Sequence, residues 1–126
     1  AQLERIESIL KTRSEIERNY VQTLSQYDFA GWQQNIEGNR RVTWLVCVML
    51  NGKDRDNAIK ILRENGVDAR PFFYQLSEMP VYSKYATKPC LVSSKLSKCG
   101  LNLPTIDNVE FERVSMAFQQ IAIDNP

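Results

Sequence analysis

Residues 42–50 read VTWLVCVML, a nearly unbroken run of apolar side chains rich in β-branched and aromatic types. Such side chains favour strands, and a continuous apolar run is typical of a central strand covered on both faces. Asn51-Gly52 follows at once, and these two residue types favour a turn. The run therefore predicts a buried central strand over 42–50, in which Cys47 is a small hydrophobic residue.

The residues after this strand predict a helix and then a second strand. Asp54 is placed to cap a helix over 55–65, and Gly66 is the residue type that usually follows a helix C-terminus. Residues 67–74 return as a strand that contains Pro71. Because proline cannot donate a hydrogen bond to a neighbouring strand, we expect Pro71 at a sheet edge or a bend.

Helices are predicted at both ends of the chain. Residues 1–27 carry apolar side chains at three- and four-residue steps, the spacing of one helix face. Residues 91–98 predict a short helix and residues 100–104 a third short strand. Asp107 and Glu110 have the spacing of a capping box at the start of a last helix. The inner face of that helix is predicted to consist of Phe111, Val114, Phe118 and Ile121.

Together these elements predict an α+β fold, with a small three-stranded sheet packed with helices and preceded by a long N-terminal helix. The chain has 126 residues, a usual size for one domain, and we expect a single domain over 1–126. Within it, residues 1–27 form the leading helix, 28–41 a connecting loop, and 42–126 the core of sheet and helices.

Composition excludes several classes of function. The net charge is +1, which predicts neither nucleic acid nor a membrane as a partner. The chain contains no histidine, so Ser-His-Asp and Cys-His nucleophile pairs and most zinc sites are excluded. Its three cysteines form no CxxC motif, and an odd count argues against a disulfide framework. We expect no metal site and a reducing, cytoplasmic location.

The segment Arg70-Pro71-Phe72-Phe73-Tyr74 combines an arginine with three consecutive aromatic side chains. Strand alternation would place Phe72 and Tyr74 on one face and Phe73 on the other, and a core accounts for one face only. Arginine offers a planar fork to phosphate or carboxylate, and an aromatic ring offers a stacking surface. The residues alone leave two interpretations open: contact with a ligand, or core packing combined with surface exposure.

Several motifs together resemble the C-terminal part of the DegT/DnrJ family of sugar aminotransferases. They are VTWLVCVML, then RDNAIKILRENGVDARPFFYQLSEMPVY, and later LNLPT. The ARPFFY segment is most similar to the GDP-perosamine synthases of that family. The opening LERIESILKTRSEIERNYVQTL resembles the family helix that leads from the cofactor domain into the small domain. The order and spacing of the motifs agree up to about Ile121, although Gln75 stands where relatives usually have proline.

The resemblance implies an enzyme dependent on pyridoxal phosphate (PLP) that transfers an amino group from glutamate to a nucleotide-linked 4-keto-6-deoxy sugar. In the family, the Schiff-base lysine and the acid that pairs with the pyridine nitrogen lie in the larger N-terminal domain. We expect that domain to be absent from this chain, so that the chain itself binds no PLP and carries no catalytic residue. The lysines that this excludes as Schiff-base candidates lie at positions 11, 53, 60, 84, 88, 95 and 98.

For the full-length enzyme the resemblance implies a homodimer and a nucleotide-sugar substrate, contacted by Arg70, Phe72, Phe73 and Tyr74. The predicted first helix starts at Ala1 without a cap or an initiator methionine, so we expect the chain to begin inside something longer. The hypothesis is a C-terminal fragment of such an aminotransferase, inactive alone. The alternative is a stand-alone, non-catalytic binding or dimerisation module derived from that domain.

Overall fold

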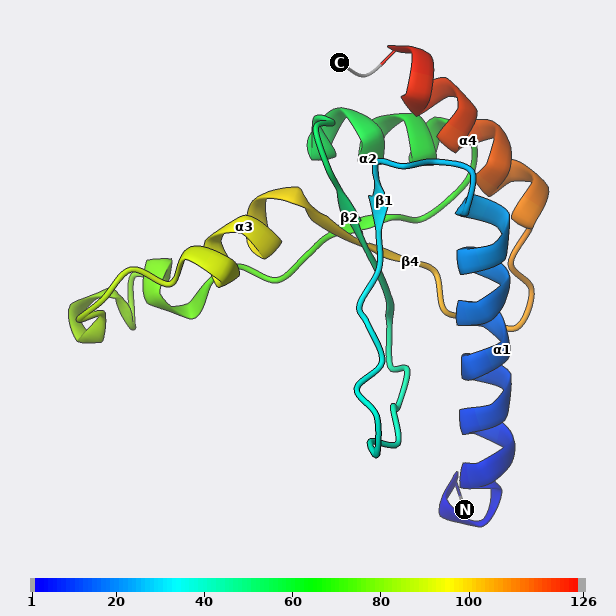
Figure 1. Cartoon of the computed structure of the whole chain (residues 1–126), viewed down its shortest axis with the longest axis horizontal. Coiled ribbons are helices and arrows are strands. Elements are labelled where there is room, and N and C mark those ends of the chain that lie inside the picture. The colour runs from blue at the N-terminus through cyan, green and yellow to red at the C-terminus, as the bar shows by residue number, and fades with distance from the viewer. Residues whose placement is uncertain (1, 125–126) are drawn as a thin grey trace.

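A computed structural model describes residues 2–124, and Figure 1 shows their arrangement. The first residue of the predicted leading helix, Ala1, lies outside the described residues, as do residues 125 and 126. A 3-10 turn at Gln2–Arg5 precedes the long helix α1, which spans Ile6–Leu24. The other helices are α2 (Arg55–Glu64), α3 (Leu91–Cys99) and α4 (Phe111–Asp124). The strands are β1 (Ala30–Gly31), β2 (Val46–Leu50), β3 (Arg70–Pro71) and β4 (Gly100–Leu103).

The four strands form one antiparallel sheet in the order β1-β2-β4-β3. In its centre Val46 lies opposite Leu103 and Val48 lies opposite Leu101. Two 3-10 turns, Leu76–Glu78 and Ser83–Tyr85, lie between β3 and α3 in an arm that projects away from the sheet (Figure 1). The predicted α+β class, with a small sheet and a long N-terminal helix, is confirmed.

The hydrophobic core fills the space between one face of the sheet and helices α1, α2 and α4. The ring of Phe118 is fully buried in it and lies 5.8 Å and 6.0 Å, between ring centroids, from Tyr27 and Phe29. Burial of such apolar surface is the main favourable contribution to folding. The other side chains with no more than 2% exposure include Tyr20, Leu24, Val46, Val48, Leu50, Leu62, Leu101, Leu103, Val114 and Ile121.

Helix α2 begins at Arg55 as predicted and ends at Glu64, one residue before the predicted end, and both predicted end residues have their expected roles. The side chain of Asp54 accepts a hydrogen bond from the backbone N–H of Asn57 at 2.9 Å, as an N-cap residue does. Gly66 has a φ of 78°, the left-handed conformation that glycine adopts most readily. The second half of the predicted apolar stripe is buried along α1, whereas Leu3 in the preceding 3-10 turn and Ile6 at the start of α1 are exposed.

The sheet has four strands among the described residues, and the prediction of three was wrong. The missed strand, β1, lies inside the predicted loop 28–41 and pairs Ala30 with Leu50. It has only two residues, so it carries no alternation that could identify it. The central strand also begins later than predicted, at Val46, because the chain bends at residues 44–45. Its second face is less covered than predicted, since Cys47 and Met49 are half-buried.

Two more boundaries differ from the prediction. The strand predicted over 67–74 pairs with β4 only at Arg70 and Pro71, and Pro71 lies at the sheet edge as expected. The last helix begins at Phe111 and not directly after Asp107, because the first helical hydrogen bond runs from the backbone N–H of Val114 to the carbonyl of Glu110, at 3.3 Å. Among residues 2–124, no helix has the length and apolar character that crossing a membrane requires.

We expect Phe118→Ala to lower the free energy of unfolding by about 3–5 kcal/mol, because it leaves a cavity among close-packed aromatic rings. Met116→Ala, in the same helix but 61% exposed, should change it by less than about 0.5 kcal/mol. Urea denaturation followed by circular dichroism measures both. Equal effects of the two substitutions would contradict the assigned core.

Candidate functional site

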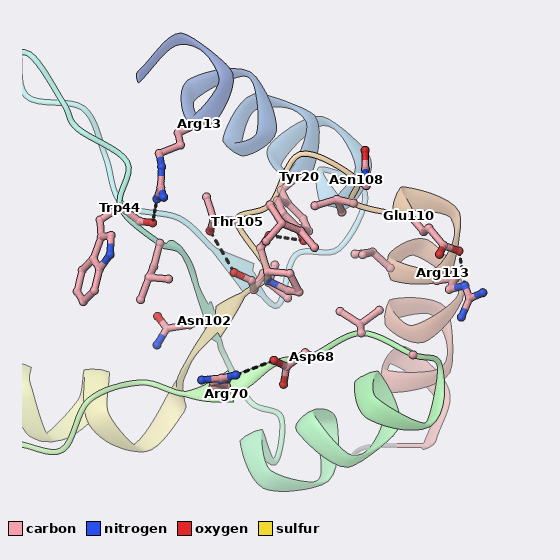
Figure 2. Close-up of a pocket in the computed structure, with 18 of the residues that line it drawn as sticks. Arg13, Tyr20, Trp44, Asp68, Arg70, Asn102, Thr105, Asn108, Glu110 and Arg113 are labelled. Carbon is pink, nitrogen blue, oxygen red and sulfur yellow. Dashed lines mark hydrogen bonds and ion pairs between the residues drawn. The ribbon is translucent and has the colours of Figure 1, made fainter. Parts of the chain in front are cut away.

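A groove of about 680 Å³ lies where α1, the start of α4 and the β3 edge of the sheet meet (Figure 2). Its volume falls within the range of about 300–1,000 Å³ that is usual for small-molecule sites. Two hydrogen bonds hold the segment that follows β4 along the groove. The hydroxyl of Tyr20 donates to the carbonyl of Pro104 at 2.9 Å, and the Thr105 hydroxyl accepts from the backbone N–H of Val46 at 2.9 Å. Burial raises the pKa of Tyr20, so its hydroxyl keeps its proton.

Three arginines line the groove. Arg70 donates to the Asp68 carboxylate at 2.9 Å, and this hydrogen bond raises the pKa of an already permanent cation. Arg113 pairs with Glu110 at the start of α4. Arg13 donates instead to a neutral group, the backbone carbonyl of Trp44 (Figure 2). The groove therefore offers guanidinium groups to an anionic ligand.

The structure brings two of the four predicted site residues into the groove. Arg70 and Phe73 line it, whereas Phe72 and Tyr74 are not among its lining residues. Phe72 is half-buried, its backbone N–H donates to the carbonyl of Gly100 at 2.9 Å, and its ring meets that of Phe73 edge-on at 5.9 Å. Tyr74 is 72% exposed. The predicted alternation fails here because the ladder of β3 ends at Pro71.

Trp44 is a groove residue that the sequence analysis did not identify. Its ring stacks on Phe73, with 5.9 Å between ring centroids and 10° between planes, and the residue is 65% exposed. In a continuous strand over 42–50, Trp44 would share the buried face of Val46. The bend at residues 44–45 turns it outward. In the sequence, the one signal of this outward orientation is that Trp44 stands next to the polar Thr43 at the start of the apolar run 42–50.

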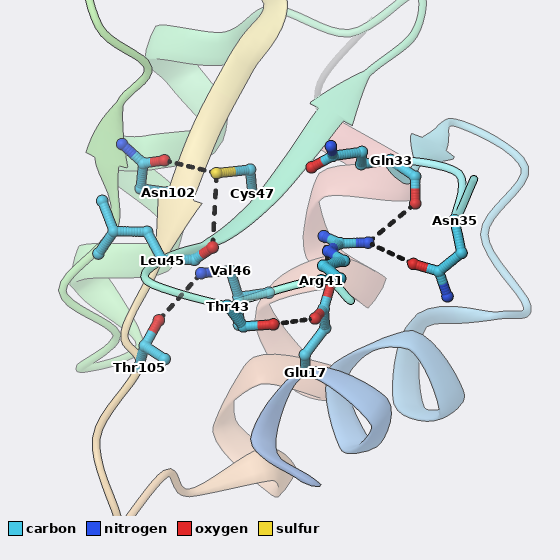
Figure 3. Close-up of polar contacts among 10 residues, drawn as sticks. All are labelled: Glu17, Gln33, Asn35, Arg41, Thr43, Leu45, Val46, Cys47, Asn102 and Thr105. Atoms are coloured by element: carbon cyan, nitrogen blue, oxygen red, sulfur yellow. Dashed lines mark hydrogen bonds and ion pairs between the residues drawn. The ribbon is translucent and has the colours of Figure 1, made fainter. Parts of the chain in front are cut away.

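The chain on the N-terminal side of Trp44 is attached to α1 through Glu17 (Figure 3). The Glu17 carboxylate accepts a hydrogen bond from the hydroxyl of Thr43 and forms an ion pair with Arg41. Arg41 also donates to the carbonyl of Gln33 at 3.0 Å, which connects the two sides of the loop before β2. The Glu17 and Arg41 side chains are only 14% and 27% exposed, so water screens this pair less than a surface pair.

Cys47 takes part in a polar contact that crosses the sheet. Its thiol lies 3.1 Å from the side-chain carbonyl of Asn102, whose amide donates to the carbonyl of Pro71 at 3.3 Å (Figure 3 shows the first contact). Burial raises the pKa of the Cys47 thiol, and the positive charge of Arg41 opposes the shift. Cys47 is therefore more than the small hydrophobic residue that the sequence predicts.

The groove residues do not fit PLP as a covalently held cofactor. PLP needs a lysine that forms a Schiff base, and no lysine is among the residues that line this groove or the smaller hollow beside Arg5. All of the lysines except the half-buried Lys53 are exposed. Among residues 2–124, no group of three metal-ligating side chains is placed to hold a metal ion.

Comparisons with known proteins place these observations in context. Residues 1–122 match the model of the DegT/DnrJ/EryC1/StrS aminotransferase family. The chain is 30% identical to a GDP-perosamine synthase of Caulobacter vibrioides over 98% of its length, covering 35% of that protein. It is also 30% identical to a GDP-perosamine synthase of Vibrio cholerae over 83% of its length, covering 29% of that protein. The chain thus spans about a third of the length of these relatives.

Solved structures show the same fold in larger proteins. The chain matches a DegT/DnrJ/EryC1/StrS aminotransferase from Brucella abortus with a TM-score of 0.77 and 21% identity, over 93% of this chain and 32% of that one. It matches the sugar aminotransferase CalS13 from Micromonospora echinospora with a TM-score of 0.76 and 14% identity, over 96% and 32% of the two chains. At these identities the likeness concerns the fold.

The raised pKa of Cys47 predicts slow alkylation that depends on pH. The thiolate is the form that reacts. The alkylation rate of Cys47 should therefore still rise with pH at values where the alkylation rate of a free thiol in a short peptide has reached its plateau. Reaction with iodoacetamide at several pH values, followed by peptide mass spectrometry, measures the rate. The exposed Cys90 of the same chain controls for reagent access. A Cys47 profile that coincides with that of the peptide would contradict the assigned environment.

Proposed function

The chain belongs to the DegT/DnrJ/EryC1/StrS aminotransferase family, and we propose that it is the C-terminal part of a PLP-dependent enzyme that aminates a nucleotide-linked 4-keto-6-deoxy sugar. The observation that carries this proposal is the 30% identity to a GDP-perosamine synthase over 98% of the chain. The relatives are about three times as long, so the proposed activity belongs to a longer protein.

In this proposal PLP is bound by the part of the enzyme outside this chain. When bound, PLP supplies an electron sink for carbanion chemistry at the amino-bearing carbon. The lining of the groove supports this assignment of PLP binding to another part of the enzyme, because arginines and aromatic rings line the groove and no lysine does. This chain then contributes substrate binding, and by itself it is inactive.

Arg70 and Phe73 are the residues we propose as the main substrate contacts. Arg70 uses one guanidinium nitrogen for Asp68, and its other N–H groups are available for a diphosphate. Its side chain is 73% exposed, so no rearrangement of the core is needed to reach a ligand. The Phe73 ring is 56% exposed and offers a face to a flat ring. Phe72 supports Phe73 through its edge contact, and Tyr74 lies next along the chain.

A homodimer and a cytoplasmic location complete the proposal. Exposed apolar side chains on the projecting arm, such as Leu76, Val81 and Leu91, support contact with another subunit or another part of the enzyme. The free thiols of Cys47, Cys90 and Cys99 suit a reducing compartment.

The experiment that tests the proposal compares this chain with the product of the complete reading frame that contains it. With glutamate and a GDP-linked 4-keto-6-deoxy sugar, we expect the complete protein to form the amino sugar and to show the absorbance band of lysine-bound PLP. The 126-residue chain should do neither. Tight binding of the nucleotide sugar by the chain alone would favour the stand-alone module instead.

In the complete enzyme, Arg70→Ala should raise the KM for the nucleotide sugar about tenfold or more, because a charge-assisted hydrogen bond to phosphate is lost. Phe73→Ala should raise it by a similar factor through loss of stacking. Arg18→Ala, on α1 and outside the groove, is the matched control and should leave KM unchanged. Steady-state kinetics with varied nucleotide sugar gives these values. An Arg70→Ala enzyme with the KM of the parent would contradict the assigned contact.

A further inference from the structure

We infer that Trp44 is a further substrate-contact residue, stacking on the nucleobase of the substrate, and that Glu17 is the positioning residue that holds Trp44 at the groove. The inference rests on the proposed function, because it names a contact and a ligand group within the same site.

The first observation is the exposure of Trp44. A tryptophan buries the most apolar surface of any side chain when it enters a core, yet this one is 65% exposed. Its neighbours Thr43 and Val46 are both buried, so the indole is turned away from a core that lies directly beside it. The indole lines the groove and stacks nearly parallel to Phe73, from a separate segment.

The second observation is the set of contacts that holds this segment. Arg13 bonds the backbone carbonyl of Trp44, and Glu17 bonds both the hydroxyl of Thr43 and the guanidinium of Arg41. All three contacts come from one face of α1, and none of them involves the indole ring. The backbone is therefore held firmly while the aromatic surface stays available, which is the arrangement a binding residue needs.

The third observation concerns the ligand. Because the two rings stack on each other, each keeps an outer apolar face, and a planar nucleobase stacks well on such a face. Figure 2 shows Arg13 and Arg70 also directed at the groove that Trp44 borders. Guanidinium groups suit the diphosphate that follows the base. A nucleoside diphosphate joined to a sugar therefore matches the groove, with its base on the aromatic rings and its diphosphate beside the arginines.

Positioning by Glu17 is tested on the 126-residue chain without any ligand. With Trp32→Phe as background, Trp44 is the sole tryptophan, and its fluorescence anisotropy reports how firmly the indole is held. We expect Glu17→Gln to lower the anisotropy and increase quenching by acrylamide. Glu15→Gln, an exposed carboxylate on the same helix that pairs only across 4.0 Å with Lys11, is the matched control and should change neither.

A second variant keeps this test decisive if Glu17→Gln lowers stability. Thr43→Val removes one of the two Glu17 contacts and leaves the ion pair with Arg41 in place, so it should produce a smaller change in the same direction. Far-ultraviolet circular dichroism verifies folding in each case. Anisotropy equal to that of the Glu15→Gln control in both variants would overturn the positioning role.

The contact is tested in the complete enzyme. Trp44→Ala should raise the KM for the nucleotide sugar about tenfold, with kcat and the KM for glutamate nearly unchanged, and Trp44→Phe should restore most of the affinity. Glu17→Gln should raise the same KM about two- to fivefold, because the indole is present but less well placed. Met116→Ala, 61% exposed on α4 and not among the residues that line the groove, is the control. A Trp44→Ala enzyme whose KM is unchanged, where Arg70→Ala raises it, would overturn the inference.

Failure of the proposed function would be recognised separately. If the complete protein does not aminate nucleotide sugars, its binding of ligands still decides the inference. The complete protein is then titrated with GDP and with mannose 1-phosphate, and the part of the tryptophan fluorescence that Trp44→Phe removes is followed. Saturable quenching by GDP supports stacking on a base. Quenching by mannose 1-phosphate alone, or by neither compound, overturns it.

Discussion

The antiparallel pairing of β2 with β4 is the contact on which the rest of this structure depends. Val46 and Val48 lie opposite Leu103 and Leu101, so the two strands present one apolar face to three helices. Burial of that face drives folding. The outer strands, β1 and β3, have two residues each, and strands this short form only because an ordered neighbour offers its backbone groups.

The same pairing also decides where the site residues lie. The chain leaves β4 directly into Pro104 and Thr105. The hydrogen bond between Tyr20 and Pro104 connects this segment to α1, and the one between Val46 and Thr105 connects it to β2. At the other end of β4, Gly100 allows close approach of neighbouring segments. A Cβ there would lie 2.6 Å from the carbonyl oxygen of Leu96 and 3.0 Å from the Cβ of Phe72. The absence of a side chain therefore lets the aromatic segment pack against β4.

Much of the fold could be predicted because its signals are local. The Asp54 cap, the glycine after α2 and the helical spacing in α4 depend on residues within a few positions of one another. Pro71 at the sheet edge follows in the same way from its missing N–H group. The strand β1 could not be predicted, because its two residues acquire strand geometry only by pairing with β2.

The site was less predictable than the fold. The sequence by itself determined that the segment of Arg70, Phe72, Phe73 and Tyr74 stands out chemically, since a guanidinium and three adjacent aromatic rings exceed what one strand face can bury. Only the tertiary structure decided that Phe72 packs on β4, that Tyr74 points to solvent, and that Trp44 stacks on Phe73 at the groove. The physical reason is that residue type and spacing report local preference. Which side chains meet is set by the bend at residues 44–45 and by the hold of Glu17 on the segment before it, through contacts between residues far apart in the chain.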